Sequence, residues 1–155
     1  MHDITLLELF TDDIGTAERL LELIDHEFQA LGERDLPRLQ TLLTEKQPLL
    51  GLLEEHGRTR SQLLLDAHLS ADRAGLQALA AQSSQGALLL ERGDQLSDLL
   101  ERCQQANLRN GRLIRANQAS TSSMLGILRG NETPSLYDSR GAAARIGQQR
   151  PLSQA

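Results

Sequence analysis

Hydrophobic residues recur at heptad spacing along the first thirty residues of the chain. One line holds Leu7, Ile14, Leu21 and Phe28, and its companion line holds Phe10, Ala17, Ile24 and Leu31. Because every a and d position is apolar, this pattern predicts a helix with a uniformly apolar seam, suited to a scaffold. Asp3 is a candidate N-cap and Gly32 is placed to end the helix, so we expect it to span about residues 4 to 31.

A second helix start follows at Asp35, where Pro37 fits a first turn whose N–H groups have no helical partners. The apolar line beyond it comprises Leu36, Leu43, Leu50, Gly57 and Leu64. We expect one helix over about residues 36 to 67, kinked near Pro48 or Gly57 rather than divided in two.

Residues 68 to 84 are more polar and predict a short connecting helix. The heptad resumes after Gln85, with Leu89, Leu96, Cys103, Asn110, Asn117 and Met124 at one position and Arg92, Leu99, Ala106, Leu113, Ser120 and Ile127 at the other. After Gly130 the pattern stops, and too few large apolar residues remain to form a core. We therefore expect an all-α fold: a long antiparallel helical bundle or coiled coil of three long helices, a short connecting helix and a mobile C-terminal tail. The predicted domains are a bundle over 1–130 and a tail over 131–155 that carries a candidate short docking helix.

Composition supports helix and argues against several functional classes. The chain has 33 Leu and 16 Ala but no Val or Trp, a composition that favours helices over strands. The net charge is −5, and residues 1 to 57 carry −9 of charge, which leaves the remainder mildly basic. Only Arg109, Arg112 and Arg115 approach a basic cluster, so we expect no nucleic-acid partner. No signal-peptide pattern opens the chain and no apolar run approaches a membrane span, so we expect a cytoplasmic protein.

Candidate chemistry is sparse. Di-iron bundles use Glu-x-x-His, but leucines stand three residues before His26, His56 and His68, so we expect no metal site. No glycine-rich phosphate loop is present, which argues against nucleotide cofactors, and no small-molecule substrate is indicated. Cys103 lies on an apolar line and fits a buried hydrophobe better than a nucleophile. We expect no enzyme, with a histidine phosphotransfer bundle as the least favoured alternative.

Polar residues interrupt the apolar stripes at Lys46, Asn110 and Asn117. Two interpretations remain open at this point. In the first, these polar residues lie at an edge of the bundle and face water. In the second, they line a surface kept adaptable for an incoming helix, since polar residues at a and d positions weaken a seam while specifying its partner.

The same C-terminal residues carry a family resemblance. The pattern N-G-x-L-I-x-x-N is formed by Asn110, Gly111, Leu113, Ile114 and Asn117. It is followed by Leu125, Leu128 and Gly130, and then by the pattern Tyr-Asp-x-x-Gly at Tyr137, Asp138 and Gly141. This pattern resembles the C-terminal signature of FlgN-type flagellar export chaperones. The leucine-rich segment from Leu20 to Leu50 is also similar to that family, although less specifically.

The resemblance implies a cytoplasmic chaperone that binds the C-terminal amphipathic helices of hook-filament junction proteins, prevents their premature assembly and delivers them to the membrane export gate. The client-binding residues expected on this basis are Asn110, Leu113, Ile114, Asn117, Met124, Leu125 and Leu128. Tyr137, Asp138 and Gly141 would dock at the export gate, although Tyr137 could equally pack back on the bundle. A non-enzymatic coiled-coil scaffold or adaptor is the main alternative, and a homo-oligomer remains open.

Overall fold

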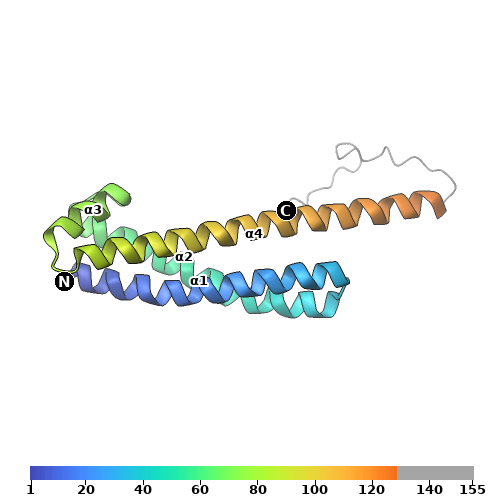
Figure 1. Cartoon of the computed structure of the whole chain (residues 1–155), viewed down its shortest axis with the longest axis horizontal. Coiled ribbons are helices and arrows are strands. Elements are labelled where there is room, and N and C mark those ends of the chain that lie inside the picture. The colour runs from blue at the N-terminus through green and yellow to red at the C-terminus, as the bar shows by residue number, and fades with distance from the viewer. Residues whose placement is uncertain (129–155) are drawn as a thin grey trace. The chain divides into compact units, whose positions relative to one another are not determined.

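The computed structural model describes residues 1–128, and every regular element in that range is a helix (Figure 1). The elements are α1 (His2–Glu33), α2 (Leu36–Asp66), α3 (Arg73–Gln82) and α4 (Gly86–Leu128). Three long helices and one short connecting helix confirm the predicted fold class. The chain separates into two compact units, residues 1–108 and residues 109–155, and α4 contributes to both. Among residues 1–128, none of the helices contains an apolar stretch of the length that a bilayer span requires.

The two ends predicted for α1 are both displaced. Met1 is the N-cap and Asp3 lies inside the first turn, where its Oδ1 accepts hydrogen bonds from the N-terminal amine and from the N–H of Ile4. At the other end the helix runs past Gly32, and Arg34 adopts a left-handed conformation with φ 56°. The N–H of Asp35 then bonds to the carbonyl of Ala30. The site of the reversal is therefore set by the short connection to α2, not by the glycine.

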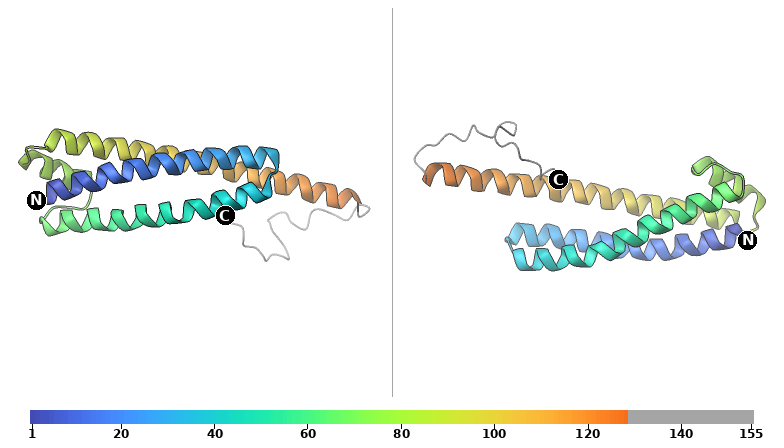
Figure 2. Two further views of the ribbon diagram at one scale, coloured as in Figure 1. Left: turned by 90° about the horizontal axis from the view of Figure 1, so that it is seen from below. Right: turned by 180° about the vertical axis from the view of Figure 1, so that it is seen from behind.

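The start of α2 is as predicted, with the Asp35 carboxylate accepting the N–H of Arg38 at 3.1 Å. The helix continues through Pro48 without a break, which confirms one helix rather than two, and Figure 2 shows it following a bent path. Asp72 caps α3 by accepting the N–H of Gly75. A Cβ at Gly75 would lie 1.7 Å from the carbonyl oxygen of Ser70, so only glycine fits there.

The first unit is built around α1, which packs against both α2 and the N-terminal part of α4. Its main cluster comprises Leu6, Phe10, Ile14, Ala17, Leu64, Leu76, Leu89, Leu96 and Leu99. A second cluster holds Leu20, Ile24, Cys103 and Ala106, and a third holds Leu23, Ala30 and Leu42. Low-numbered α1 residues thus meet high-numbered α2 residues, so this pair is antiparallel, whereas α4 runs parallel to α1 within this unit.

The seam of α1 is not uniformly apolar, so that prediction is wrong. Phe28 is exposed, and Leu7 and Leu21 are only partly buried. The buried line lies one residue earlier and includes Asp13 and Glu27. Apolar residues occur on both lines of this helix, and contact with two neighbouring helices selects the buried one.

Candidate functional site

The C-terminal segment of α4, residues 109–128, carries the residues expected to bind a partner helix. Ile114, Met124 and Leu125 are 40%, 56% and 44% exposed, while Leu113 and Asn117 are partly buried. Leu128 ends the helix, and its side chain lies outside what the structure describes. The predicted set therefore contains three exposed apolar residues, Ile114, Met124 and Leu125, and two less exposed residues, Leu113 and Asn117.

Helical geometry places the exposed members on one face. Steps of three or four residues lead from Ile114 to Asn117, from Asn117 to Thr121, and from Thr121 to both Met124 and Leu125, so all five lie along one side of the helix. The hydroxyl of Thr121 donates to the carbonyl of Asn117, so its polar atom is satisfied by the helix itself. Such an exposed apolar stripe can bind the apolar face of another helix without any cofactor.

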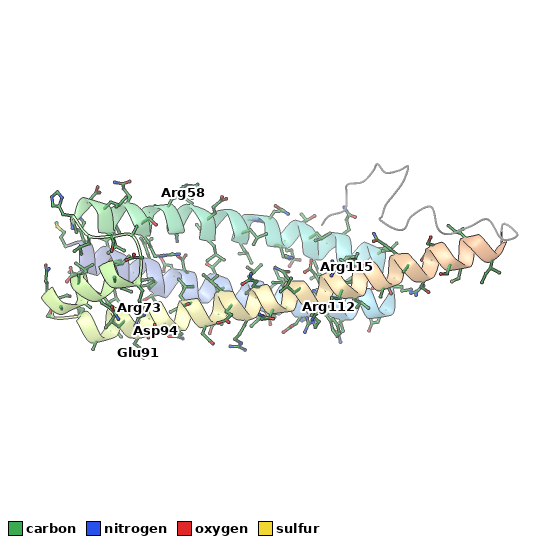
Figure 3. All side chains as sticks on the ribbon, turned by 90° about the horizontal axis from the view of Figure 1, so that it is seen from above. Arg58, Arg73, Glu91, Asp94, Arg112 and Arg115 are labelled. Atoms are coloured by element: carbon green, nitrogen blue, oxygen red, sulfur yellow. The ribbon has the colours of Figure 1, made fainter. Side chains whose placement is uncertain are left out.

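Asn110 differs from the rest of the predicted set because it is only 5% exposed. Its Oδ1 accepts a hydrogen bond from Nε of Arg109 at 3.1 Å. The interpretation that Asn110 faces water at a bundle edge is therefore wrong. Arg112 and Arg115, by contrast, are exposed, as their side chains in Figure 3 illustrate.

Lys46 also has a role that neither sequence interpretation anticipated. Its Nζ lies 2.9 Å from Oε1 of Glu27, and the two side chains are 11% and 6% exposed. Lys46 therefore neither faces water nor lines an open surface. A buried ion pair of this kind is best attested as a device that specifies helix register.

A second polar cluster lies on the same α1–α2 interface. The Asp13 carboxylate is fully buried, and its two oxygens contact Nδ1 of His56, at 2.6 Å, and Nη1 of Arg60. The Arg60 guanidinium also lies 5.7 Å from the centre of the Phe10 ring. Asp13 and Glu27 were not singled out from the sequence. The signal available was their fourteen-residue separation, which places both on one heptad line of α1.

The remaining chemistry-bearing residues do not assemble into a reactive centre within residues 1–128. No group of three or more His, Cys, Asp or Glu in that range could hold a metal ion. Cys103 is buried, its thiol lies 3.6 Å from the carbonyl oxygen of Ala17, and burial raises its pKa. This is the environment of an inert, buried thiol. The three predicted docking residues, Tyr137, Asp138 and Gly141, and the predicted tail lie outside the described residues.

Comparison with known proteins identifies the family. The model of the FlgN protein family matches residues 1–145 of this chain. Among solved structures, the chain is similar to a crystal structure from Pseudomonas aeruginosa of a protein described as a flagella synthesis protein FlgN. The sequences are 60% identical with a TM-score of 0.69, and the match covers 81% of this chain and 96% of that chain. A comparison with curated proteins found no match. With a family match over nearly its whole length and a solved relative of 60% identity, this chain belongs to the FlgN family of flagellar proteins.

Proposed function

We propose that this chain is a cytoplasmic chaperone of flagellar type III export that binds the C-terminal amphipathic helices of hook-filament junction proteins. The observation that carries the proposal, beside family membership, is the exposed apolar face of α4 formed by Ile114, Met124 and Leu125. Covering such a face with a client helix buries apolar surface on both partners. The client is thereby held soluble, because the stripe through which it would assemble is occupied.

This mode of action requires no catalytic group. Affinity comes from apolar burial, at roughly 1.5–3 kcal/mol for each large side chain that becomes fully buried. Release needs only a competing partner or withdrawal of the client. In this proposal Tyr137, Asp138 and Gly141 contact the membrane export gate, as the family resemblance implies. The other predicted contacts with the client are Asn110, Leu113, Asn117 and Leu128.

The direct test is a titration of the full-length chain with a C-terminal fragment of a hook-filament junction protein. We expect a defined soluble complex, and we expect Met124→Glu or Leu125→Glu to raise its Kd by about ten- to a hundredfold, since each 1.4 kcal/mol is tenfold. The matched control is Ala119→Glu, which adds the same charge to an exposed position on the opposite side of α4. Equal losses in all three variants would mean that the charge, not the apolar face, matters.

Self-association separates the proposal from the adaptor alternative. An adaptor would form oligomers without the client, and light scattering of the purified chain would detect them. A chain that oligomerises stably and ignores the client fragment would contradict the chaperone assignment. Failure of export in a strain carrying Tyr137→Ala, with client affinity retained, is the result expected for a docking role of that residue.

A further inference from the structure

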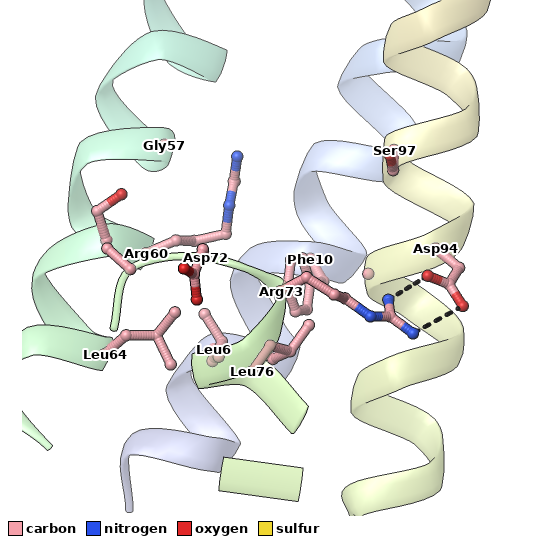
Figure 4. A pocket seen from close by; sticks show the side chains of 13 residues that line it. Leu6, Phe10, Gly57, Arg60, Leu64, Asp72, Arg73, Leu76, Asp94 and Ser97 are labelled. Atoms are coloured by element: carbon pink, nitrogen blue, oxygen red, sulfur yellow. Dashed lines mark hydrogen bonds and ion pairs between the residues drawn. The ribbon is translucent and has the colours of Figure 1, made fainter. Parts of the chain in front are cut away.

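An open cavity of about 590 Å³ lies within the first unit, between α2 and α4, with α1 beneath it and α3 at one end (Figure 4). Its floor is apolar and is formed by Leu6, Phe10, Leu64 and Leu76. The volume falls in the range of about 300–1,000 Å³ typical of ligand pockets. Every residue that lines this cavity belongs to the first unit.

The charged groups that line the cavity already have partners within the first unit. Arg60 is paired with the buried carboxylate of Asp13. Arg73 is paired with Asp94, and the dashed lines in Figure 4 mark this second pair. The carboxylate of Asp72 accepts hydrogen bonds from Ser70 and from the N–H of Gly75. Burial also lowers the pKa of Arg60, consistent with a guanidinium largely removed from water. Because both arginines are paired with carboxylates and the floor is apolar, the surface that best complements the cavity is apolar rather than ionic.

Small residues keep the mouth of the cavity open on both sides. The cavity is lined by two pairs of small residues, and the members of each pair are one helical turn apart. The pairs are Gly57 and Ser61 on α2 and Gly93 and Ser97 on α4. A Cβ at Gly93 would lie 3.0 Å from Cδ2 of Leu76, so this glycine allows the floor to approach α4 closely. Small residues on two flanking helices leave room for a third backbone between them.

Apolar residues extend the same two rows away from α3. Leu50 and Leu43 lie seven and fourteen residues before Gly57 on α2, and Leu100 lies seven residues after Gly93 on α4. All three leucines are exposed. Each step of seven residues turns the position by only about 20° around the helix axis, so the three leucines stay close to the side of the helix that lines the cavity. The row on α2 spans fourteen residues, or about 21 Å at 1.5 Å per residue, which is the length of about four helical turns.

We propose that this α2–α4 groove, comprising the cavity and the rows that extend it, is a second contact surface for the client's amphipathic helix. Its occupant is a helix of about four turns whose apolar ridge enters between the two rows, in the position of the missing fourth helix of a bundle. This inference rests on the proposed function, because it takes the exported client as the partner. It adds a contact in the first unit to the one proposed at residues 109–128.

The test fills the groove without removing any core group. Gly57→Leu places a side chain in the mouth, where a Cβ meets only Nη2 of Arg60 at 3.6 Å, an ordinary contact distance. The matched control is Gly51→Leu in the same helix, where a Cβ meets nothing within 4 Å and which does not line the cavity. Both changes favour helix, so thermal unfolding followed by circular dichroism is expected to show no loss of stability in either variant.

The probe is the C-terminal client fragment titrated into the full-length chain. We expect Gly57→Leu to raise the Kd at least tenfold and Gly51→Leu to change it less than twofold. A photo-crosslinking residue at Ser97 should also capture the client helix, and a self-crosslinked dimer in its place would overturn the assignment of the occupant. Unchanged affinity of Gly57→Leu, with tight binding by the unsubstituted chain, would overturn this inference while leaving the proposed function standing. No binding by the unsubstituted chain would instead refute the proposed function.

Discussion

Removing one partner of the buried pair between Lys46 and Glu27 provides a sharp test of what holds α1 against α2. The charged atoms lie 2.9 Å apart, and the side chains are nearly inaccessible to water. At an effective dielectric constant of about 20, unit charges at this distance attract by roughly 6 kcal/mol. Desolvation costs several kcal/mol for each ion, so the intact pair contributes little net stability. A single buried charge left behind has no such compensation.

Lys46→Met and Glu27→Leu should therefore each destabilise the protein by about 3–5 kcal/mol. The double variant replaces the pair with apolar side chains, and we expect its free energy of unfolding to lie within about 1 kcal/mol of the original or above it. The two single effects are thus expected to be strongly non-additive, as a double-mutant cycle would reveal.

Urea unfolding measured by far-ultraviolet circular dichroism is the suitable assay, because the chain is helical, has no Trp and has one Tyr. The control is Arg58→Met in the same helix, which breaks an ion pair with Glu54 whose side chains are 69% and 75% exposed. That change should cost less than about 1 kcal/mol. Two results would contradict this account of the buried pair. One is a loss of stability in the single variants as small as that of the control. The other is a loss in the double variant equal to the sum of the two single losses.

Three further predictions concern local structure. Hydrogen bonds from Ser70 and Gly75 lower the pKa of Asp72, so its contribution to stability is complete above its pKa in the unfolded chain and is lost as the pH falls through its pKa in the folded protein. The variant Asp72→Asn keeps the helix cap and should flatten the dependence of Tm on pH between 5 and 2; an unchanged slope would argue against this role. Burial raises the pKa of Cys103, so a disulfide reagent at pH 8 should label it far more slowly in the folded protein than in urea, and equal rates would contradict its burial. Gly15→Ala, in open space within α1, should stabilise by about 0.5–1 kcal/mol, whereas Gly75→Ala should destabilise measurably because its Cβ would overlap the Ser70 carbonyl; unfolding midpoints of the two variants compare them directly.

Local sequence signals predicted the helices because each depends on near neighbours. The Asp35 cap and the tolerance of Pro37 in a first turn are both properties of a few adjacent residues, and α2 begins where they indicate. The heptad of α4 was also assigned correctly through Leu89, Leu96 and Cys103, all of which are buried. By contrast, the end of α1 depends on a bond between the N–H of Asp35 and the carbonyl of Ala30, which the glycine pattern does not reveal.

The candidate site was predictable in part. The residues Ile114, Met124 and Leu125 were expected to bind a client on the basis of the family resemblance, and of the three only Met124 lies on the heptad lines of the sequence; all three are exposed. The cavity between α2 and α4 was not predictable, because Gly57 and Gly93 belong to different helices and line one cavity only after both helices pack on α1. The contribution of Leu76 to its floor likewise depends on the position of α3.

Local sequence is enough to predict that this chain is helical, where its long helices lie and which family pattern its C-terminal residues follow. Those properties arise from backbone preferences and from periodicity within one segment. The packing of the helices buries the α1 line that contains Asp13 and Glu27 more fully than the apolar line that begins at Leu7, and so brings Asp13 to Arg60 and Glu27 to Lys46. The physical reason is that burial depends on every helix packed around a residue, and a charge becomes tolerable inside only when a distant part of the chain supplies its partner.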